Sequence, residues 1–171
     1  MKSVFKRGSL FFALVSLMVV MLNSGASAEM SKMGKMNKMG KMSNGVENSA
    51  PVMGGYDPVS YFEMGKPVRG SGFHTSTYNG GTYLFANKEN KVKFMSNPGK
   101  YAPQFGGYCA YGVSVGKKFY SDPNIWKIVD GKLYLNLDKN IQKKWNEDIS
   151  GHITKADSNW MKIEHKAPSE L

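Results

Sequence analysis

The sequence predicts an α+β fold, and two kinds of local signal carry this prediction. Two turn sequences, Asn79-Gly80-Gly81 and Asp130-Gly131, each lie between stretches rich in β-branched and aromatic residues, a pattern typical of hairpins. A capping residue followed by a helix-forming stretch comes after each hairpin. Tight hairpins favour antiparallel pairing, so we expect small antiparallel sheets packed with short helices.

The first 28 residues predict a secretory signal peptide. Positive residues (Lys2, Lys6 and Arg7) precede an apolar run over 10–22, and small residues end the segment at Ala28. An uncleaved membrane anchor is the alternative, but a spanning helix needs about 20 apolar residues and this run is shorter. We therefore expect cleavage after Ala28 and a periplasmic or secreted protein.

Residues 29–50 predict a disordered, Met/Lys-rich tether. Methionine recurs there with a strict period of three, which matches neither a helix nor a strand, and it is the only obvious repeat in the sequence. Glycines, small polar residues and repeated lysines argue against a packed core. The repeated methionines are Met30, Met33, Met36, Met39 and Met42.

The charge of the remaining chain predicts an ordinary surface. The formal net charge is +10, but seven of the positive residues lie in the predicted signal peptide and tether. From Gly45 onward, 16 Lys and Arg residues face 12 Asp and Glu residues, which gives +4. A nucleic-acid-binding protein needs clustered positive charge on its folded part, so we expect no nucleic-acid partner.

Residues 51–165 predict one globular domain, followed by a flexible end over 166–171. Three Trp, nine Tyr and six Phe follow residue 50 and can supply an apolar core. The chain has a single cysteine, so no internal disulfide can supplement that core.

The first half of this domain predicts a turn, a hairpin and a helix. Asp57-Pro58 predicts the turn, with a short strand over 59–62. Strands over 73–78 and 82–86 form the hairpin. Asn87 predicts the N-cap of a helix over 88–95, closed by Asn97-Pro98, with Val92 and Phe94 facing the sheet.

The second half is glycine- and aromatic-rich over 103–116, where no element is assigned. A hairpin is predicted with strands over 125–129 and 132–137. Asp138 then predicts the N-cap of a helix that extends to about residue 148. Ser150-Gly151 predicts an interruption, and a second helical stretch follows it over 153–160.

The stretch from Tyr56 to Tyr101 resembles a YHS domain. The residues that carry the resemblance are Asp57-Pro58-Val59, Tyr78-Asn79-Gly80, Tyr83-Leu84-Phe85, Phe94 and Pro98-Gly99-Lys100-Tyr101. The resemblance implies a small treble-clef-like fold of a family found beside copper- and heavy-metal-transporting ATPases, for which metal binding is inferred. The remainder, 106–160, resembles the extension of exported bacterial YHS-containing proteins.

The sequence departs from the family pattern at its metal ligands. Members thought to bind metal carry cysteines where this chain has Ser60, Ala86 and Asn90, and Asn79 stands where a His is frequent. The soft thiolate ligands for zinc or copper(I) are therefore absent from these positions. The resemblance implies the fold without the metal site.

Cys109 is the sharpest single candidate for a metal ligand. Its thiolate could bind copper(I) or zinc together with His74, His152 or a methionine thioether. The alternatives are a buried cysteine packed among aromatic neighbours and a reactive or intermolecular thiol.

The methionine repeat is the second candidate. Thioethers are soft, uncharged ligands that suit copper(I) in an oxidising compartment. The accompanying lysines repel a cation, and they favour instead a basic tether attracted to an anionic surface.

The leading hypothesis is a non-enzymatic exported protein that binds or handles copper(I). The alternative is a module that binds a protein or a small ligand through an aromatic surface. A weaker third reading is an accessory to an exported oxidase or hydroxylase. The chain lacks motifs for nucleophilic catalysis or phosphate binding, which disfavours an enzyme. The predicted aromatic surface comprises Tyr56, Tyr61, Tyr83, Tyr108, Tyr111, Tyr120 and Trp126.

Overall fold

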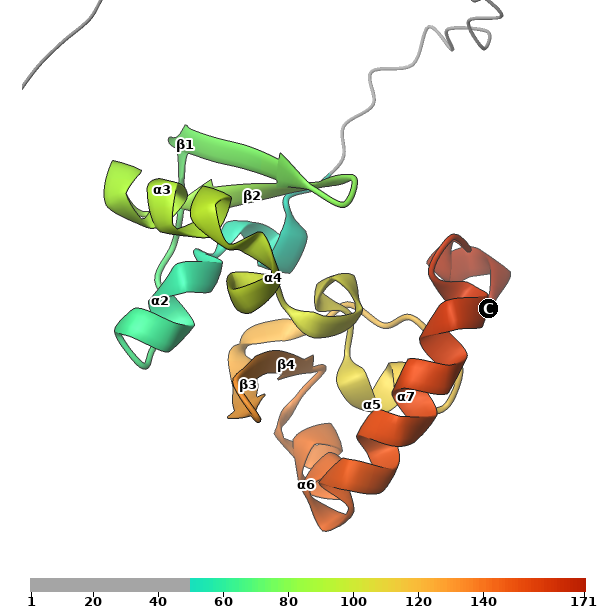
Figure 1. The fold of residues 1–171 in the computed structure, drawn as a ribbon. Coiled ribbons are helices and arrows are strands. Elements are labelled where there is room, and N and C mark those ends of the chain that lie inside the picture. The colour runs from blue at the N-terminus through green and yellow to red at the C-terminus, as the bar shows by residue number, and fades with distance from the viewer. Residues whose placement is uncertain (1–49) are drawn as a thin grey trace, which may run out of the picture. The chain divides into compact units, whose positions relative to one another are not determined.

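Two antiparallel hairpins and a series of short helices build the part of the chain that the structure, a computed structural model, describes: residues 50–171 (Figure 1). These residues belong to one unit, Glu47–Leu171. The predicted α+β class is confirmed. The predicted signal peptide and nearly all of the predicted tether lie outside the described residues. Within residues 50–171, no helix is long and apolar enough to cross a membrane.

Both predicted hairpins are confirmed. Strand β1 (Ser71–Tyr78) pairs with β2 (Gly81–Phe85), and β3 (Asp122–Val129) pairs with β4 (Lys132–Asn136). The two central residues of each turn have positive φ: 46° and 74° at Asn79-Gly80, and 49° and 72° at Asp130-Gly131. This is the geometry of the two-residue turn that Asn-Gly and Asp-Gly favour, because its twist matches that of the strands.

The predicted strand over 59–62 is wrong, since these residues lie in helix α2 (Pro58–Glu63). Asp57 is its N-cap, and the Asp57 Oδ1 atom accepts a hydrogen bond from the Val59 amide at 2.8 Å. Proline suits the first helical position because it has no amide hydrogen to satisfy. Asp-Pro therefore begins a helix here rather than a turn before a strand.

The helix after each hairpin is confirmed. Helix α3 (Lys88–Ser96) begins at the N-cap Asn87, and α6 (Lys139–Glu147) begins at the N-cap Asp138. Phe94 is buried as predicted, whereas Val92 is 53% exposed, so its predicted packing on the sheet is wrong.

The helices that follow are α4 (Pro98–Tyr101) and α7 (Ile149–Ile163). The predicted interruption at Ser150-Gly151 is wrong, because both residues lie inside α7. The chain instead breaks at Asp148, whose side chain accepts a hydrogen bond from the Gly151 amide at 2.9 Å and so caps α7.

The glycine-rich segment 103–116 contains the 3-10 turn η3 (Gln104–Gly107) and helix α5 (Ala110–Ser114). A similar turn, η2 (Val52–Gly55), begins the described chain. The final residues form a third 3-10 turn, η4 (Pro168–Glu170), and Leu171 packs against the core of the second half.

The described chain contains the same structural unit twice, which the sequence analysis missed. Repeat 1 is η2-α2-β1-β2-α3-α4, and repeat 2 is η3-α5-β3-β4-α6-α7, in the same order. Each hairpin has its register irregularity at the matching place, between Ser71 and Thr75 and between Asp122 and Trp126. The isolated bridges Tyr56–Arg69 and Tyr108–Tyr120 also correspond.

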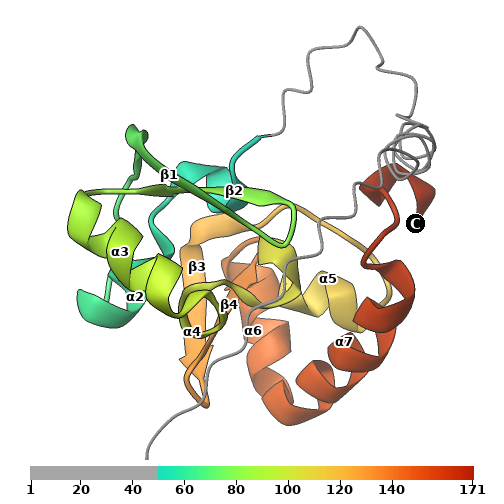
Figure 2. The same ribbon diagram turned by 45° about the horizontal axis from the view of Figure 1, so that its top comes forward.

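Three clusters of buried side chains stabilise the two repeats and their contact with each other. One lies within repeat 1 around Phe85 and Phe94, and one lies within repeat 2 around Val113 and Trp145. The third joins the repeats, because Tyr61 of α2 packs on hairpin β3–β4 beside Leu133 and Leu135. Helix α5 is the equivalent of α2 and packs against the long helix α7. Figures 1 and 2 show α5 and α7 side by side.

Candidate functional site

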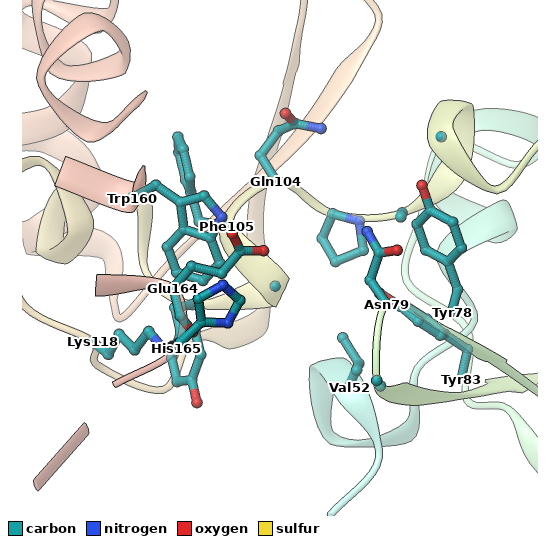
Figure 3. Close-up of a pocket in the computed structure, with 17 residues that line it drawn as sticks. Val52, Tyr78, Asn79, Tyr83, Gln104, Phe105, Lys118, Trp160, Glu164 and His165 are labelled. Carbon is teal, nitrogen blue, oxygen red and sulfur yellow. Dashed lines mark hydrogen bonds between the residues drawn. The ribbon is translucent and has the colours of Figure 1, made fainter. Parts of the chain in front are cut away.

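A cavity of about 470 Å³ lies between the two repeats and is the candidate site (Figure 3). One wall is the β1–β2 turn with Tyr78, Asn79 and Tyr83, and the opposite wall is the end of α7 with Trp160 and Glu164. The segment that connects the repeats also lines it. The remaining lining residues are Val52, Gly80, Gly81, Gly99, Ala102, Pro103, Gln104, Phe105, Gly106, Tyr108, Lys118 and His165.

Three aromatic rings build the repeat 2 wall of this inter-repeat cleft. The ring centroids of Phe105 and Trp160 are 5.9 Å apart, and those of Tyr108 and Trp160 are 6.4 Å apart. Gly106 has φ +61°, and a Cβ at this residue would lie 3.5 Å from the Trp160 ring. Glycine thus suits the left-handed backbone of the turn, against which Trp160 lies.

Lys118 stands beside this aromatic wall and holds the end of α7. It is 7% exposed, and its Nζ donates hydrogen bonds to the carbonyl oxygens of Glu164 at 2.8 Å and Lys166 at 2.7 Å. The same ammonium lies 5.2 Å from the Tyr108 ring centroid and 5.0 Å from that of Trp160. Burial lowers the pKa of Lys118, while Glu164 and Glu170 oppose that shift.

Burial raises the pKa of two phenols in the cleft, those of Tyr83 and Tyr108. Burial raises the pKa of Tyr83 to about 12, with a smaller contribution from Tyr78. Burial also raises the pKa of Tyr108. These hydroxyl groups can therefore both donate and accept hydrogen bonds near neutral pH.

Polar side chains enter the cleft from both walls. Figure 3 shows Asn79 and Glu164 on opposite sides of the cleft, with His165 beside Glu164 and Gln104 at one end. The arrangement combines aromatic ring surface with a lining that is more polar than apolar.

The predicted metal ligand Cys109 lies in the core. It is 0% exposed, its Sγ accepts a hydrogen bond from the Gly112 amide at 3.4 Å, and Sγ is 3.8 Å from Asn136 Oδ1. Burial raises the pKa of the Cys109 thiol, against the opposing effect of backbone hydrogen bonds. A buried thiol with a raised pKa is a poor nucleophile and a poor metal ligand.

The other predicted ligands are not assembled into a metal site among the described residues. His74 lies on β1, and His152 Nδ1 lies 3.1 Å from Ser114 Oγ. Within residues 50–171, no group of three or more His, Cys, Asp or Glu side chains could hold a metal ion. The five methionines of the repeat lie outside the described residues, so the prediction made for them stays a prediction.

Three of the positions where the YHS resemblance places metal ligands, Ser60, Ala86 and Asn90, lie around Asp57, whereas Asn79 lies in the β1–β2 turn. The buried Asp57 Oδ2 accepts hydrogen bonds from the Ala86 amide at 2.9 Å and from Asn90 Nδ2 at 2.6 Å. Ser60 Oγ donates to the Asp57 carbonyl at 2.7 Å. A metal site would need electron-pair donors at these positions, but the groups found there donate hydrogen bonds to Asp57. The arrangement therefore stabilises the fold.

The predicted aromatic residues do not form one surface. Tyr61 is 1% exposed and Tyr83 is 4% exposed, whereas Tyr120 is 75% exposed. Of the seven, Tyr83 and Tyr108 line the cleft. The sequence analysis did not find Phe105, Lys118, Trp160, Glu164 or His165 as site residues, because a cleft between repeats is visible only once the duplication is recognised.

The comparisons with known proteins identify no relative: no family model, no curated protein and no solved structure matches the chain. The resemblance to YHS domains over 56–101 therefore stays a prediction.

Proposed function

We propose that residues 50–171 form a non-enzymatic binding module that takes a small ligand in the inter-repeat cleft. The observation that carries this proposal is the cavity itself, about 470 Å³, with aromatic rings on one wall and polar side chains on both. Small-molecule sites typically measure about 300–1,000 Å³ and combine apolar walls with a few convergent polar groups.

The wall of repeat 2 is preorganised. Lys118 fixes the carbonyl end of α7 through two hydrogen bonds, and Trp160 packs against Phe105 and Gly106. A wall that is already ordered loses little conformational entropy when a ligand binds. The geometry therefore supports recognition without a rearrangement of this wall.

The serine and histidine that lie beside each other among the described residues are outside the cleft. Ser114 Oγ is 3.1 Å from His152 Nδ1 and 2.7 Å from the Tyr111 carbonyl oxygen, and neither Ser114 nor His152 lines the cleft. This pair therefore cannot act on a ligand held in the cleft, which supports a binding role.

A fragment screen by protein-observed NMR tests the module. Residues 29–171 are labelled with ¹⁵N and titrated with a diverse set of small, soluble fragments. We expect hits to shift the signals of the Trp160 indole and the Asn79 and Gly106 amides, and Trp160→Ala to abolish the shifts. Trp126→Phe is the matched control, because Trp126 packs on Tyr61 away from the cleft lining. Hits confined to other surfaces, or none, would overturn the proposal.

Copper(I) binding by the methionine repeat is a second proposal, supported by five thioethers at a spacing of three. Because Cys109 is buried, we expect the ions on the repeat rather than in the domain. An anaerobic copper(I) titration of residues 29–171 should show binding that disappears in a chain starting at Gly45 and persists in Cys109→Ser. Binding weaker than about micromolar, which is about 8 kcal/mol, would overturn this proposal.

A further inference from the structure

The charges of the inter-repeat cleft favour a neutral ligand. The lining contains one lysine and one glutamate. Lys118 uses two of its three N–H donors on the carbonyl oxygens of Glu164 and Lys166, so an anion would meet the Glu164 carboxylate and at most one free N–H of Lys118. A cation would meet the Lys118 ammonium, which lies 5.0 Å from the Trp160 ring centroid.

The polar groups of the cleft favour a ligand that carries several hydroxyl groups. Asn79 and Gln104 offer both donors and acceptors, and the Glu164 carboxylate offers two acceptor oxygens. Figure 3 shows that Asn79 and Glu164 approach from opposite walls, so a ligand between them needs polar groups along its edge. Asn79 and Glu164 are exposed and hydrogen-bond to water in the free protein, so a ligand that covers them must offer polar groups in place of that water.

The aromatic rings favour a ligand with flat C–H faces. Trp160 and Tyr108 are partly exposed and line the cavity, whereas the Tyr83 ring is almost fully buried. The C–H groups on one face of a pyranose ring pack against such surfaces, while its hydroxyl groups project from the rim. A cavity of about 470 Å³ is also of the size of small-molecule sites.

We propose that the ligand of the inter-repeat cleft is a neutral saccharide of one or two pyranose rings. The ring stacks on the Trp160 side of the cleft, and its hydroxyl groups bind Asn79 and Glu164. This inference rests on the proposed function and adds the chemical class of the ligand. The sugar is either free or the end of a glycan chain, because both present the same ring.

The test is a titration of residues 29–171 with glucose, galactose, N-acetylglucosamine, maltose and cellobiose, followed by NMR and by Trp fluorescence. We expect at least one sugar to bind more tightly than about 10 mM, with shifts at the Trp160 indole and the Asn79 amide. Equal affinity for a disaccharide and its hexasaccharide would indicate a free sugar or chain end. Affinity that rises with chain length would indicate a polysaccharide, and both outcomes support the saccharide class.

Three variants locate the sugar. Trp160→Ala should weaken binding at least about tenfold, because it removes the stacking surface. Glu164→Gln should weaken it about threefold to tenfold, since the amide replaces one acceptor oxygen by a donor. Asn79→Gly should have a similar effect and preserves the turn, because glycine adopts the positive φ of 46° found there. Trp126→Phe should leave the affinity unchanged.

The outcomes separate this inference from the proposed function. If no sugar binds but fragments still shift the cleft signals, the saccharide class is wrong and the module stands. If neither sugars nor fragments bind, both proposals fail. Sugar binding that survives Trp160→Ala and Glu164→Gln would place the sugar elsewhere and overturn this inference.

Discussion

The two repeats share a backbone and differ in the polar group that each buries at the start of its first helix. In repeat 1 this group is Asp57, and in repeat 2 it is Cys109, each directly after a Gly-Gly-Tyr sequence. The Asp57 carboxylate accepts three hydrogen bonds, two from amides and one from Asn90. Cys109 Sγ accepts one from Gly112, while the nearby Asn136 Nδ2 has no hydrogen-bond partner among the described residues. The same backbone position thus holds a carboxyl group with three hydrogen bonds in one repeat and a weakly bonded thiol in the other.

The repeats also differ in what covers their first helix. Tyr61 of α2 packs edge-on against Trp126 of repeat 2, with ring centroids 5.2 Å apart, and donates a hydrogen bond to the Pro123 carbonyl. Helix α5 has no third repeat to pack on, and α7 covers it instead. In repeat proteins a terminal unit needs such a cap to bury the face that the next unit would otherwise bury. In this protein the cap also supplies Trp160 and Glu164, so the element that ends the array completes the cleft.

The largest expected difference between the repeats is at the buried anchors. Asp57→Ala leaves the Val59 and Ala86 amides and the Asn90 side chain without their acceptor, so we expect the free energy of unfolding to fall by about 3–5 kcal/mol. Cys109→Ala removes two weak hydrogen bonds, one from the Gly112 amide and one to Asn136 Oδ1, together with the sulfur atom, and should cost about 1–2 kcal/mol. Urea unfolding of both variants measures the difference. Equal costs would contradict the distinction between an anchor and a packed thiol.

Tyr83 in repeat 1 and Tyr134 in repeat 2 occupy equivalent positions, and an alkaline titration can distinguish the pKa values of their phenols. Burial raises the pKa of both, that of Tyr83 to about 12 from 10.0. A raised pKa means that the folded state holds the proton more tightly than the unfolded state. The stabilising contribution is therefore complete below pH 10 and is lost between pH 10 and about 12, up to about 2–3 kcal/mol for Tyr83.

Tyr83→Phe and Tyr134→Phe provide the measurement. Absorbance at 295 nm should lose a late-titrating phenol in Tyr83→Phe and an earlier one in Tyr134→Phe. The stability of Tyr83→Phe should also fall less between pH 10 and 12 than that of the unmodified chain. A Tyr83 phenol that titrates near pH 10 would contradict the burial of its hydroxyl.

The local elements of the fold were predictable because they depend on a few neighbouring residues. Asn79-Gly80 and Asp130-Gly131 specify their turns, and Asn87 and Asp138 specify helix starts. The error at 59–62 has the same origin. The apolar run Val59 to Phe62 fits a strand or a buried helix turn equally well, and Asp57 as an N-cap with Pro58 after it decides for the helix.

The sequence also carries a signal of the duplication, but the similarity between the two repeats is weak. Gly54-Gly55-Tyr56 corresponds to Gly106-Gly107-Tyr108, and Tyr83-Leu84 corresponds to Tyr134-Leu135. Between these short matches, most equivalent side chains differ, because each repeat packs against a different neighbour. The cleft was not predictable from single residues, since it forms where the β1–β2 turn and α7 meet across the repeats.

A substitution of Lys118 tests how much the order of helix α7, the cap of repeat 2, depends on the hydrogen bonds from this lysine. Lys118→Met keeps the aliphatic stem but removes the hydrogen bonds to the Glu164 and Lys166 carbonyls, so we expect a loss of about 1–2 kcal/mol. Hydrogen exchange should show faster opening of the last turn of α7, while the amides of α3 in repeat 1 stay protected. Uniform loss of protection in both repeats would contradict a local role for this lysine.

The smallest expected effect is that of Trp145→Phe in repeat 2, at the core position that Phe94 occupies in repeat 1. Trp145 is 0% exposed and its Nε1 has no hydrogen-bond partner among the described residues. Trp145→Phe removes this unpaired donor but leaves a small cavity, and the two effects offset each other to within about 1 kcal/mol. Phe94→Trp, the reverse exchange, should cost about 1–3 kcal/mol, because Phe94 already contacts the rings of Tyr78, Tyr83 and Phe85. Urea unfolding of both variants checks this. The prediction is contradicted if Trp145→Phe lowers the free energy of unfolding more than Phe94→Trp does. The packing of the larger ring would then outweigh the cost of its unpaired nitrogen.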